Sequence, residues 1–521
     1  MRRMISYLIF AALSCSCATQ RPMSNATGAA PTAEIPSLPE RGGSGVGVVS
    51  PAVDFQNTIV QSGFSGQASF YVQAIGEDAP LLAYNATRAQ NPASVIKLVT
   101  SYAAIKTLGA DYRWRTELLS EEKPDADGSL KSPLYLKGSG DPQLVIEKID
   151  ALVKSLAANG VTHLQAPIVM DRSIFGNVRE DAGSFDGEPS MPYNAQPDAA
   201  LMNFHALSFN FDPATRQVSV TPYLMDYAID NSIQWVNGAC PSGGWKSAIA
   251  LNVSGTMTRV GGRYYSGCGA QSWHVHAYQL SANAYALGVL AGLMPASTDL
   301  SCCDDRSQNP RCSVKYMACS GHHSVGMAWD KASVLDGTTP KHASVLASID
   351  SAPLTDELRD MNLYSNNVMA RQVYLSLSAK EKGQGNLAAS AEIVRKRLGE
   401  QGLHLKSLSM GNGSGLSRST AISAADLGAL LVRASSDADF VNTIARLGIE
   451  GTVKNRLTDT DMVGRGRIKT GSLNDVRAIA GYIDGKSGRR YAIVSIIQSD
   501  NAQTASGKKL HDDFMVWVGN Q

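Results

Sequence analysis

The stretch that most constrains the fold is residues 92–109, because it predicts a helix that is apolar almost all the way round. Asn91 is a good N-cap and Pro92 suits a first helical position, so we expect the helix to begin there. A helix of this kind must be buried, with other elements covering it on every side. Its first turn carries Ser94 and Lys97, a hydroxyl and an amine three residues apart.

Ser94 and Lys97 are candidates for a nucleophile and its general base. Residues three apart share one face of a helix, so the Lys97 amine can reach the Ser94 hydroxyl. Burial lowers the pKa of a lysine, and the positive end of a helix stabilises a developing alkoxide. A surface serine and lysine spaced by chance would give the same pattern, so S-x-x-K alone does not show that the pair is catalytic. Residues elsewhere in the chain must decide between the two interpretations.

Bulk composition narrows the class of protein. The chain has 521 residues, of which 44% are hydrophobic and 18% are charged, so we expect two or three domains with a substantial core. The net charge is +1 and no long basic run occurs, which predicts no nucleic-acid partner.

The amino terminus is typical of an exported protein. Residues 1–18 combine two arginines, a short apolar core and small residues, which predicts a signal peptide and a periplasmic location. Residues 19–50 are rich in Pro, Gly, Ser and Ala and are expected to be a flexible linker. Cys15 or Cys17 could carry a lipid that tethers the protein to a membrane, and this alternative stays open.

Six cysteines remain after the signal, which suits disulfides in an oxidising compartment. We expect one bridge between Cys240 and Cys268. The other four could form disulfides or, with two neighbouring histidines, a zinc knot; export favours disulfides. These residues are Cys302, Cys303, Cys312, Cys319, His322 and His323. No metal or other cofactor is predicted for catalysis.

The order of elements predicts an α+β fold. Strands at both chain ends with helices between them indicate one antiparallel sheet flanked by helices and assembled from the two termini. We expect residues 51–112 and 325–521 to form this catalytic unit, and residues 113–324 to form two nested, mainly-β accessory domains. Strands are predicted at 67–75, 81–84, 112–119, 132–137, 206–211, 217–223, 467–472, 477–483 and 490–498, and helices at 142–159, 282–293, 355–361, 367–378, 386–401, 423–435 and 505–518.

Two further clusters supply what the first pair lacks. Ser365 and Asn367 lie two apart in a predicted turn before an apolar helix, where a hydroxyl can relay a proton and an amide can hold a substrate carbonyl. Lys469, Thr470, Gly471 and Ser472 lie on a predicted strand, with a cation and hydroxyls ready for a carboxylate. Each cluster alone has a plain structural reading, as a helix cap or as an ordinary strand.

Taken together, S-x-x-K, S-x-N and K-T-G in this order resemble the penicilloyl serine transferases, which comprise penicillin-binding proteins and serine β-lactamases. About 270 residues separate Ser94 from Ser365, and so large an insertion resembles the class C low-molecular-mass penicillin-binding proteins, the D-alanyl-D-alanine carboxypeptidase/endopeptidase family. Four more stretches fit that family, at residues 136–142, 192–198, 412–418 and 451–456. Asn412 departs from it, because an Asp is usual there.

The resemblance implies a role for each site residue. Ser94 would attack the penultimate D-Ala carbonyl of a peptidoglycan stem peptide, or a β-lactam, with Lys97 as base. Ser365 would pass a proton to the leaving amine, Asn367 would hold the substrate amide, and the backbone N–H groups of Ser94 and Ser472 would form the oxyanion hole. The further residues implied are Lys469 and Thr470 for the terminal carboxylate, Asp171, Arg418 and Phe175 for the diamino acid, and Asn474 near the acyl group.

Two alternatives to a serine DD-peptidase remain at this stage. A β-lactamase would need fast deacylation, and no Glu is placed as a deacylating base. A non-catalytic peptidoglycan-binding module would have no need of a nucleophile and base. The sequence leaves the oligomeric state and the balance of carboxypeptidase to endopeptidase activity open.

Overall fold

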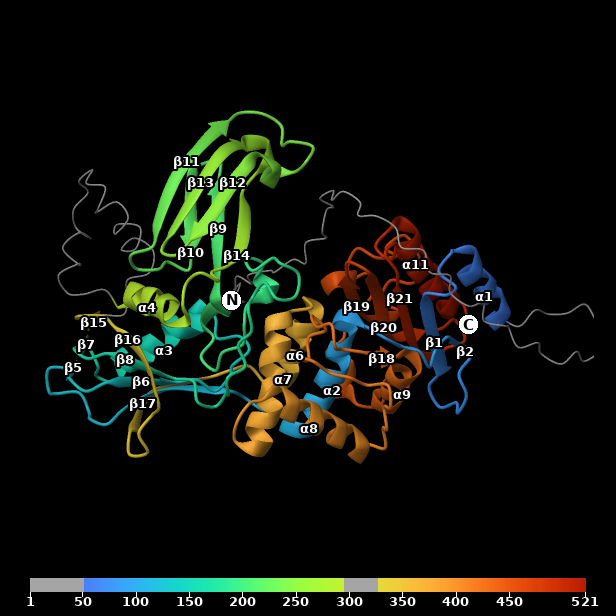
Figure 1. Ribbon diagram of the computed structural model, residues 1–521, viewed down its shortest axis with the longest axis horizontal. Helices are drawn as coiled ribbons and strands as arrows, with labels where there is room; N and C mark the ends of the chain where they lie inside the picture. Colours follow the sequence, from blue (N-terminus) through green and yellow to red (C-terminus); the bar gives the residue numbers. More distant parts are fainter. Residues whose placement is uncertain (1–50, 295–326) are drawn as a thin grey trace, which may run out of the picture.

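The computed structural model describes residues 51–294 and 327–521. Figure 1 shows two regions, an inserted region at one end of the molecule and a unit built from both ends of the chain at the other. No helix in the described ranges is long and apolar enough to cross a membrane. Four of our predictions lie outside the described residues: the signal peptide, the linker, the lipid anchor and the Cys302–Cys319 disulfides or zinc knot.

The unit built from both chain ends is organised on one five-stranded antiparallel sheet in the order β19-β20-β21-β1-β2. Alternate residues of its strands face opposite sides, as in β20, where Ala478 and Ala480 join one apolar cluster and Ile479 and Ile483 join the other. The predicted antiparallel sheet is thereby confirmed. Its strands are β1 (Ala68–Ala74), β2 (Leu82–Tyr84), β19 (Gly466–Leu473), β20 (Val476–Asp484) and β21 (Arg490–Gln498).

Helices cover both faces of this sheet (Figure 1). On one face α1 and α11 pack against the sheet through Phe55, Phe70 and Phe514. On the other face lie α2 and α9, with α6, α7 and α8 packed beyond α2, so that α2 is buried as its sequence requires. The helices are α1 (Pro51–Gln61), α2 (Lys97–Leu108), α6 (Leu354–Leu363), α7 (Asn367–Lys382), α8 (Leu387–Glu400), α9 (Ala424–Ala434), α10 (Ala438–Val441) and α11 (Ala505–Gly519).

Two predicted helix starts were wrong for the same reason. Asn91 accepts a hydrogen bond from the Ala93 N–H at 2.9 Å, and Asp141 accepts one from the Gln143 N–H at 2.8 Å. Each side chain therefore accepts from the backbone N–H two residues further on, which closes a tight turn instead of capping an α-helix. Ser94 lies in a 3-10 turn (Ala93–Ile96) and α2 begins only at Lys97, while α3 (Ile146–Ala158) begins five residues after Asp141.

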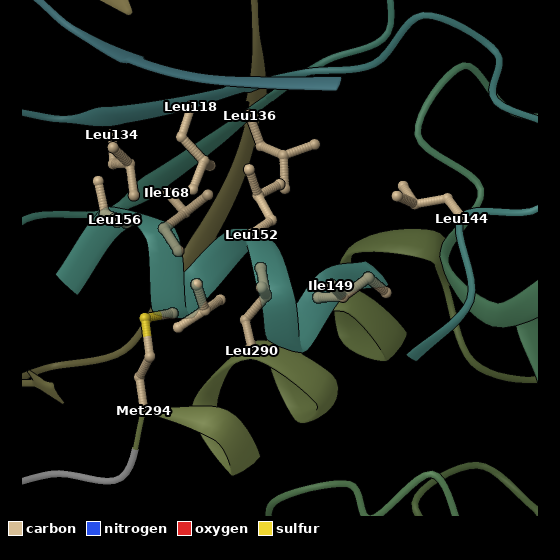
Figure 2. A pocket seen from close by; sticks show the side chains of 11 residues that line it. Leu118, Leu134, Leu136, Leu144, Ile149, Leu152, Leu156, Ile168, Leu290 and Met294 are labelled. Atoms are coloured by element: carbon tan, nitrogen blue, oxygen red, sulfur yellow. The ribbon is translucent and has the colours of Figure 1, made fainter. Parts of the chain in front are cut away.

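The inserted region has its own core. A five-stranded sheet in the order β16-β8-β6-β4-β17 packs against α3 and α4 (Ala282–Leu293). Figure 2 shows the side chains that meet there, all of them Leu, Ile, Val or Met, around a cavity of about 10 Å³ that is too small for a ligand. The strands are β4 (Arg115–Ser120), β6 (Leu134–Lys137), β8 (Ile168–Asp171), β16 (Val334–Gly337) and β17 (Ser344–Asp350).

A second group of strands lies within this insertion and projects from it in Figure 1. The predicted hairpin is confirmed, since β9 and β10 pair antiparallel. The hairpin belongs to the three-stranded sheet β10-β9-β14, and a second three-stranded sheet has the order β11-β13-β12. The predicted disulfide between Cys240 and Cys268 is present. The strands are β9 (Ala206–Asp212), β10 (Gln217–Thr221), β11 (Ala228–Val236), β12 (Ile249–Ser254), β13 (Met257–Tyr265) and β14 (Gln271–His276).

The remaining strands form small sheets. The pair β18-β3 belongs to the unit built from both chain ends and the sheet β15-β7-β5 to the insertion. Because β17 pairs with β4, residues 344–350 also belong to the insertion, so we propose that the chain returns to the unit built from both chain ends near residue 351. These small strands are β3 (Ala89–Gln90), β5 (Ser129–Leu130), β7 (His163–Leu164), β15 (Ala328–Trp329) and β18 (Ile422–Ser423).

Candidate active site

Ser94 lies in a turn whose backbone is held in an unusual conformation. Ala93, just before it, has a φ of 48°, in the left-handed region that residues with a Cβ rarely adopt. The Asn91 side chain closes the turn, and its Nδ2 also donates to the Ser417 carbonyl at 3.0 Å. Such strain persists only where the surroundings enforce it and is common beside reactive groups. The Ser94 side chain remains partly exposed at this point.

The Lys97 amine is buried and lies against Ser94. Its Nζ is 2.8 Å from Ser94 Oγ, 2.6 Å from Asn367 Oδ1 and 2.6 Å from the Ser414 carbonyl oxygen. These three oxygens belong to neutral groups, so no anion offsets the loss of hydration. Burial, with the nearby charges of Lys469 and Arg371, holds the Lys97 pKa well below its usual value. A neutral amine at this position can accept the Ser94 proton.

The second cluster meets the first at the amino terminus of α7. Asn366 caps this helix, accepting from the backbone N–H groups of Val368 and Met369 at 3.0 and 3.1 Å. The cap sets Asn367 in the first turn, where its side chain reaches Lys97. Ser365 itself has a φ of 56°, so a left-handed residue occurs at this cluster as it does beside Ser94.

Strand β19 brings the third cluster to the same place. Lys469 Nζ donates to Ser365 Oγ at 2.8 Å and to the Thr470 carbonyl at 2.7 Å, and the side chain is fully buried. Burial lowers the Lys469 pKa to about 7. Thr470 is partly exposed, and its hydroxyl lies 2.8 Å from that of Thr452.

Two glycines let the backbone close in around Ser94. A Cβ at Gly471 would lie 2.7 Å from the Pro92 carbonyl oxygen and 3.1 Å from the Ser94 nitrogen. At Gly415, with a φ of 87°, it would lie 2.0 Å from the Ala93 carbonyl oxygen. Neither contact is sterically allowed, so only glycine fits at these two positions. The edge of β19 and the loop that includes Ser414 therefore both touch the turn that carries Ser94.

Asp171 and Phe175 are buried parts of the inserted region. Asp171, at the end of β8, accepts from the Ser173 hydroxyl at 2.6 Å and from the Thr339 N–H at 2.8 Å. Burial alone would raise the Asp171 pKa, but these hydrogen bonds hold it below its usual value. Phe175 packs over Gly140 and Gly385, where a Cβ would lie 2.5 Å from its ring. Of these contacts, the one between Phe175 and Gly385 joins the insertion to the loop between α7 and α8.

Arg418, Ser472 and Asn474 are exposed. The Arg418 guanidinium lies over the Phe185 ring at 4.6 Å from its centroid, so a loop of the insertion reaches the loop that surrounds Ser94. Asn474 lies in the turn between β19 and β20. The structure thus joins Ser94, Lys97 and Asn367 in one hydrogen-bonded group, and Lys469 with Ser365 in another.

Sequence reasoning missed three groups that complete this arrangement. The Ser414 carbonyl and Thr452 lie in the stretches 412–418 and 451–456, which gave no signal of their own beyond the resemblance. Arg371 is buried on α7, one turn beyond Asn367, and its Nη1 donates to the Ala195 carbonyl at 3.0 Å. Burial lowers the Arg371 pKa to about 10. Its influence on Lys97 depends on tertiary proximity, which has no sequence signal.

Comparison with known proteins agrees with this architecture. The family model described as the D-Ala-D-Ala carboxypeptidase 3 (S13) family matches residues 56–261 and 267–521. The D-alanyl-D-alanine carboxypeptidase of Actinomadura sp. (strain R39) is 28% identical over 443 residues, covering 82% of this chain and 78% of that protein. The D-alanyl-D-alanine carboxypeptidase DacB of Haemophilus influenzae is 23% identical over 449 residues, covering 82% and 84%.

A solved structure shows the same fold. The crystal structure of penicillin binding protein 4 (dacB) from Haemophilus influenzae aligns with a TM-score of 0.69 at 19% identity, covering 89% of this chain and 99% of that one. The predicted penicillin-binding-protein fold with large insertions, and the predicted resemblance to D-alanyl-D-alanine carboxypeptidases, are confirmed. The chain belongs to the D-Ala-D-Ala carboxypeptidase 3 (S13) family of peptidases.

Proposed function

We propose that this protein is a serine-type D-Ala-D-Ala carboxypeptidase that works through an acyl-enzyme on Ser94. One observation carries the proposal: the buried Lys97 amine lies 2.8 Å from Ser94 Oγ and is surrounded by neutral oxygens. Such an amine loses its proton easily and can serve as a base near neutral pH. Membership in a family of D-Ala-D-Ala carboxypeptidases supports the choice of substrate.

The reaction follows from the positions of these groups. Ser94 Oγ attacks the carbonyl carbon of the penultimate D-Ala while Lys97 Nζ accepts its proton. The peptide C–N bond breaks, and Ser365 Oγ, hydrogen-bonded to Lys469, relays to the leaving amine of the terminal D-Ala the proton that Lys97 took up. Water then attacks the ester, which releases the shortened peptide and returns a proton to Ser94.

Charge that develops on the carbonyl oxygen needs donors fixed in advance. We place the backbone N–H groups of Ser94 and Ser472 in this role, because Gly471 allows β19 to approach the Ser94 nitrogen closely. One such donor is worth about 3 kcal/mol in the transition state. The Asn367 amide, held through its oxygen by Lys97, is left to donate to the substrate backbone.

The other proposed contacts concern the two ends of the substrate. Lys469 and Thr470 would bind the terminal carboxylate, with Thr452 orienting the Thr470 hydroxyl. Arg418 is exposed beside the site and is our choice for an anionic group of the diamino acid. Roles for Asp171, Phe175 and Asn474 in substrate binding stay predictions. The Asp171 and Phe175 contacts described above support positioning of the loop more than direct contact.

The same chemistry extends to related reactions and ligands. If the leaving amine belongs to a neighbouring stem peptide, the enzyme is a DD-endopeptidase that opens cross-links. A β-lactam would acylate Ser94 and resist hydrolysis, as expected for a penicillin-binding protein. We propose a periplasmic location, from the signal-like residues 1–18, and a lipid tether at Cys15 or Cys17 as an open variant.

Covalent labelling tests the proposal directly. Purified protein should bind fluorescent penicillin stoichiometrically and release D-Ala from pentapeptide muropeptides, as measured by gel fluorescence and mass spectrometry. Ser94→Ala should abolish both. Ser101→Ala is the matched control, because this buried serine lies on α2, just after the turn that carries Ser94, and its hydroxyl contacts no proposed catalytic side chain. It donates to the Lys97 carbonyl at 2.7 Å and accepts from the Asn362 side chain at 3.0 Å. Labelling of the Ser94 variant at the wild-type level would refute the assignment.

A further inference from the structure

One of the three oxygens around the Lys97 amine belongs to the backbone. The Ser414 carbonyl accepts from Lys97 Nζ at 2.6 Å, whereas the other two oxygens belong to side chains. A side chain can adjust by rotation about its own bonds, but a backbone carbonyl is oriented only by the conformation of its loop. The environment of Lys97 therefore depends on the groups that fix the loop at residues 411–418.

This loop is built around the side-chain amide of Asn412. Its Oδ1 accepts from the Ser414 N–H at 3.2 Å and from the Ser414 hydroxyl at 2.8 Å, and its Nδ2 donates to the Leu416 carbonyl at 2.8 Å. The Ser414 hydroxyl accepts in turn from the Leu416 N–H at 3.1 Å. One amide therefore uses both its oxygen and its nitrogen to hold the backbone before and after the Ser414 carbonyl.

The loop is also packed between two helices of the core. Thr100 on α2 donates to the Gly413 carbonyl at 2.7 Å. Gly413 has a φ of 74°, and a Cβ there would lie 2.6 Å from Cβ of Tyr374 on α7. These contacts fix where the loop lies, and the hydrogen bonds of Asn412 fix which way its peptide groups point.

The neutrality of Asn412 has an electrostatic consequence. Burial, together with the cations Lys469 on β19 and Arg371 on α7, holds the Lys97 pKa well below its usual value. A carboxylate at position 412 would be hydrogen-bonded to the residue whose carbonyl Lys97 contacts, within about 10 Å of the amine. At such a distance a negative charge would oppose the two cations and favour a protonated Lys97.

We propose that Asn412 is a positioning residue for the general base: it orients the Ser414 carbonyl toward the Lys97 amine and keeps this side of the amine free of negative charge. The inference rests on the proposed function for the role of Lys97. Among the described residues, the side chain of Asn412 hydrogen-bonds to Ser414 and Leu416, so it acts on Lys97 through the loop.

Asn412→Asp tests the charge, because a carboxylate has nearly the same size and shape as the amide. The N–H and hydroxyl of Ser414 favour an ionised carboxylate at this position. A negative charge there should make Lys97 harder to deprotonate. We expect the acid limb of the pH profile for acylation by fluorescent penicillin to move up by about one pH unit, so that acylation on that limb slows about tenfold.

Asn412→Ala tests the orientation, because it removes the hydrogen bonds without adding charge. Acylation should slow about tenfold at every pH, with the acid limb unmoved. Asn386→Asp is the matched control for charge. Asn386 caps α8 by accepting from the Ala389 N–H at 3.1 Å, a bond that a carboxylate also accepts, and it lies outside the proposed catalytic group. This variant should keep the wild-type rate and pH profile.

A direct titration of Lys97 separates this inference from the proposed function. We would follow the full-length protein by NMR with an isotope at the lysine ε-carbon, and identify the Lys97 signal by its loss in Lys97→Met. The Lys97 pKa should be higher in Asn412→Asp than in wild type and Asn386→Asp.

Equal Lys97 pKa values in wild type and Asn412→Asp, or a wild-type acylation rate in Asn412→Ala, would overturn the role of Asn412. Absence of penicillin labelling in the wild-type protein would instead overturn the proposed function. The titration needs no activity, so it would still decide whether Asn412 acts on Lys97.

Discussion

The proposed catalytic centre and the boundary between the two regions both hold lysines, which are fully buried at the centre and partly buried at the boundary, and the groups around them differ. Lys97 and Lys469 are fully buried and contact only neutral oxygens among the described residues. Lys148, on α3 at the boundary, lies 3.1 Å from Asp141 and 3.6 Å from Glu357 on α6. A buried cation without a counter-ion has a lowered pKa and can do proton chemistry, whereas a paired one mainly holds elements together.

Replacing one lysine from each place should separate these roles most clearly. Lys97→Met removes the proposed base, and we expect acylation by penicillin to slow about 10³-fold, which corresponds to about 4 kcal/mol, with little loss of stability. Lys148→Met leaves Asp141 without its cation, so it should lower the free energy of unfolding and leave the acylation rate of folded protein unchanged. Stopped-flow acylation and urea unfolding measure the two effects. The contrast fails if both variants lose acylation equally.

The second prediction concerns the backbone around the nucleophile. Gly415→Ala would push a methyl group against the Ala93 carbonyl, so we expect a loss of about 3 kcal/mol in stability and slower acylation. Gly383→Ala is the matched control, because its φ of 79° is also left-handed but nothing lies within 4 Å of the added atom. It should cost about 1 kcal/mol and leave acylation intact. Equal effects of the two changes would show that contact with the Ser94 turn is unimportant.

The smallest effect should appear at the boundary, as a dependence on pH. Glu357 is 1% exposed, and burial raises its pKa from 4.5 to about 8, in the company of Asp141, Lys148 and Asp360. The folded state therefore favours the protonated form. Its contribution to stability is complete below pH 4.5 and is lost as the pH rises through about 8.

Glu357→Gln should remove this dependence, because the amide cannot ionise. We expect the variant to be more stable than wild type by about 2 kcal/mol at pH 9, and similar to it at pH 5. Denaturant unfolding at the two pH values measures the change. Glu450→Gln is a control, since that carboxylate is paired with Arg359 at 2.6 Å and is more exposed. If wild type and Glu357→Gln lose the same stability between pH 5 and pH 9, Glu357 is not the group responsible.

Local sequence was enough for much of this fold. The apolar pattern of residues 92–109 required a buried helix, and Cys240 and Cys268 are paired as expected. The strands predicted at 477–483 and 490–498 lie within β20 and β21. The residue types of the three proposed catalytic clusters were also visible in the sequence, because proton transfer and nucleophilic attack need particular side chains. Helix starts at Asn91 and Asp141 were wrong, since a side chain that can cap a helix can equally close a turn.

Only the tertiary structure decided how these clusters work. The oxygens that surround Lys97 come from segments about 270 and 320 residues away along the chain. One of them is the backbone carbonyl of Ser414, which any residue at that position would also provide. The lowered pKa values of Lys97 and Lys469 depend on burial, which only the packed structure provides. Local patterns specify which groups are present, whereas desolvation and long-range contacts specify what those groups can do.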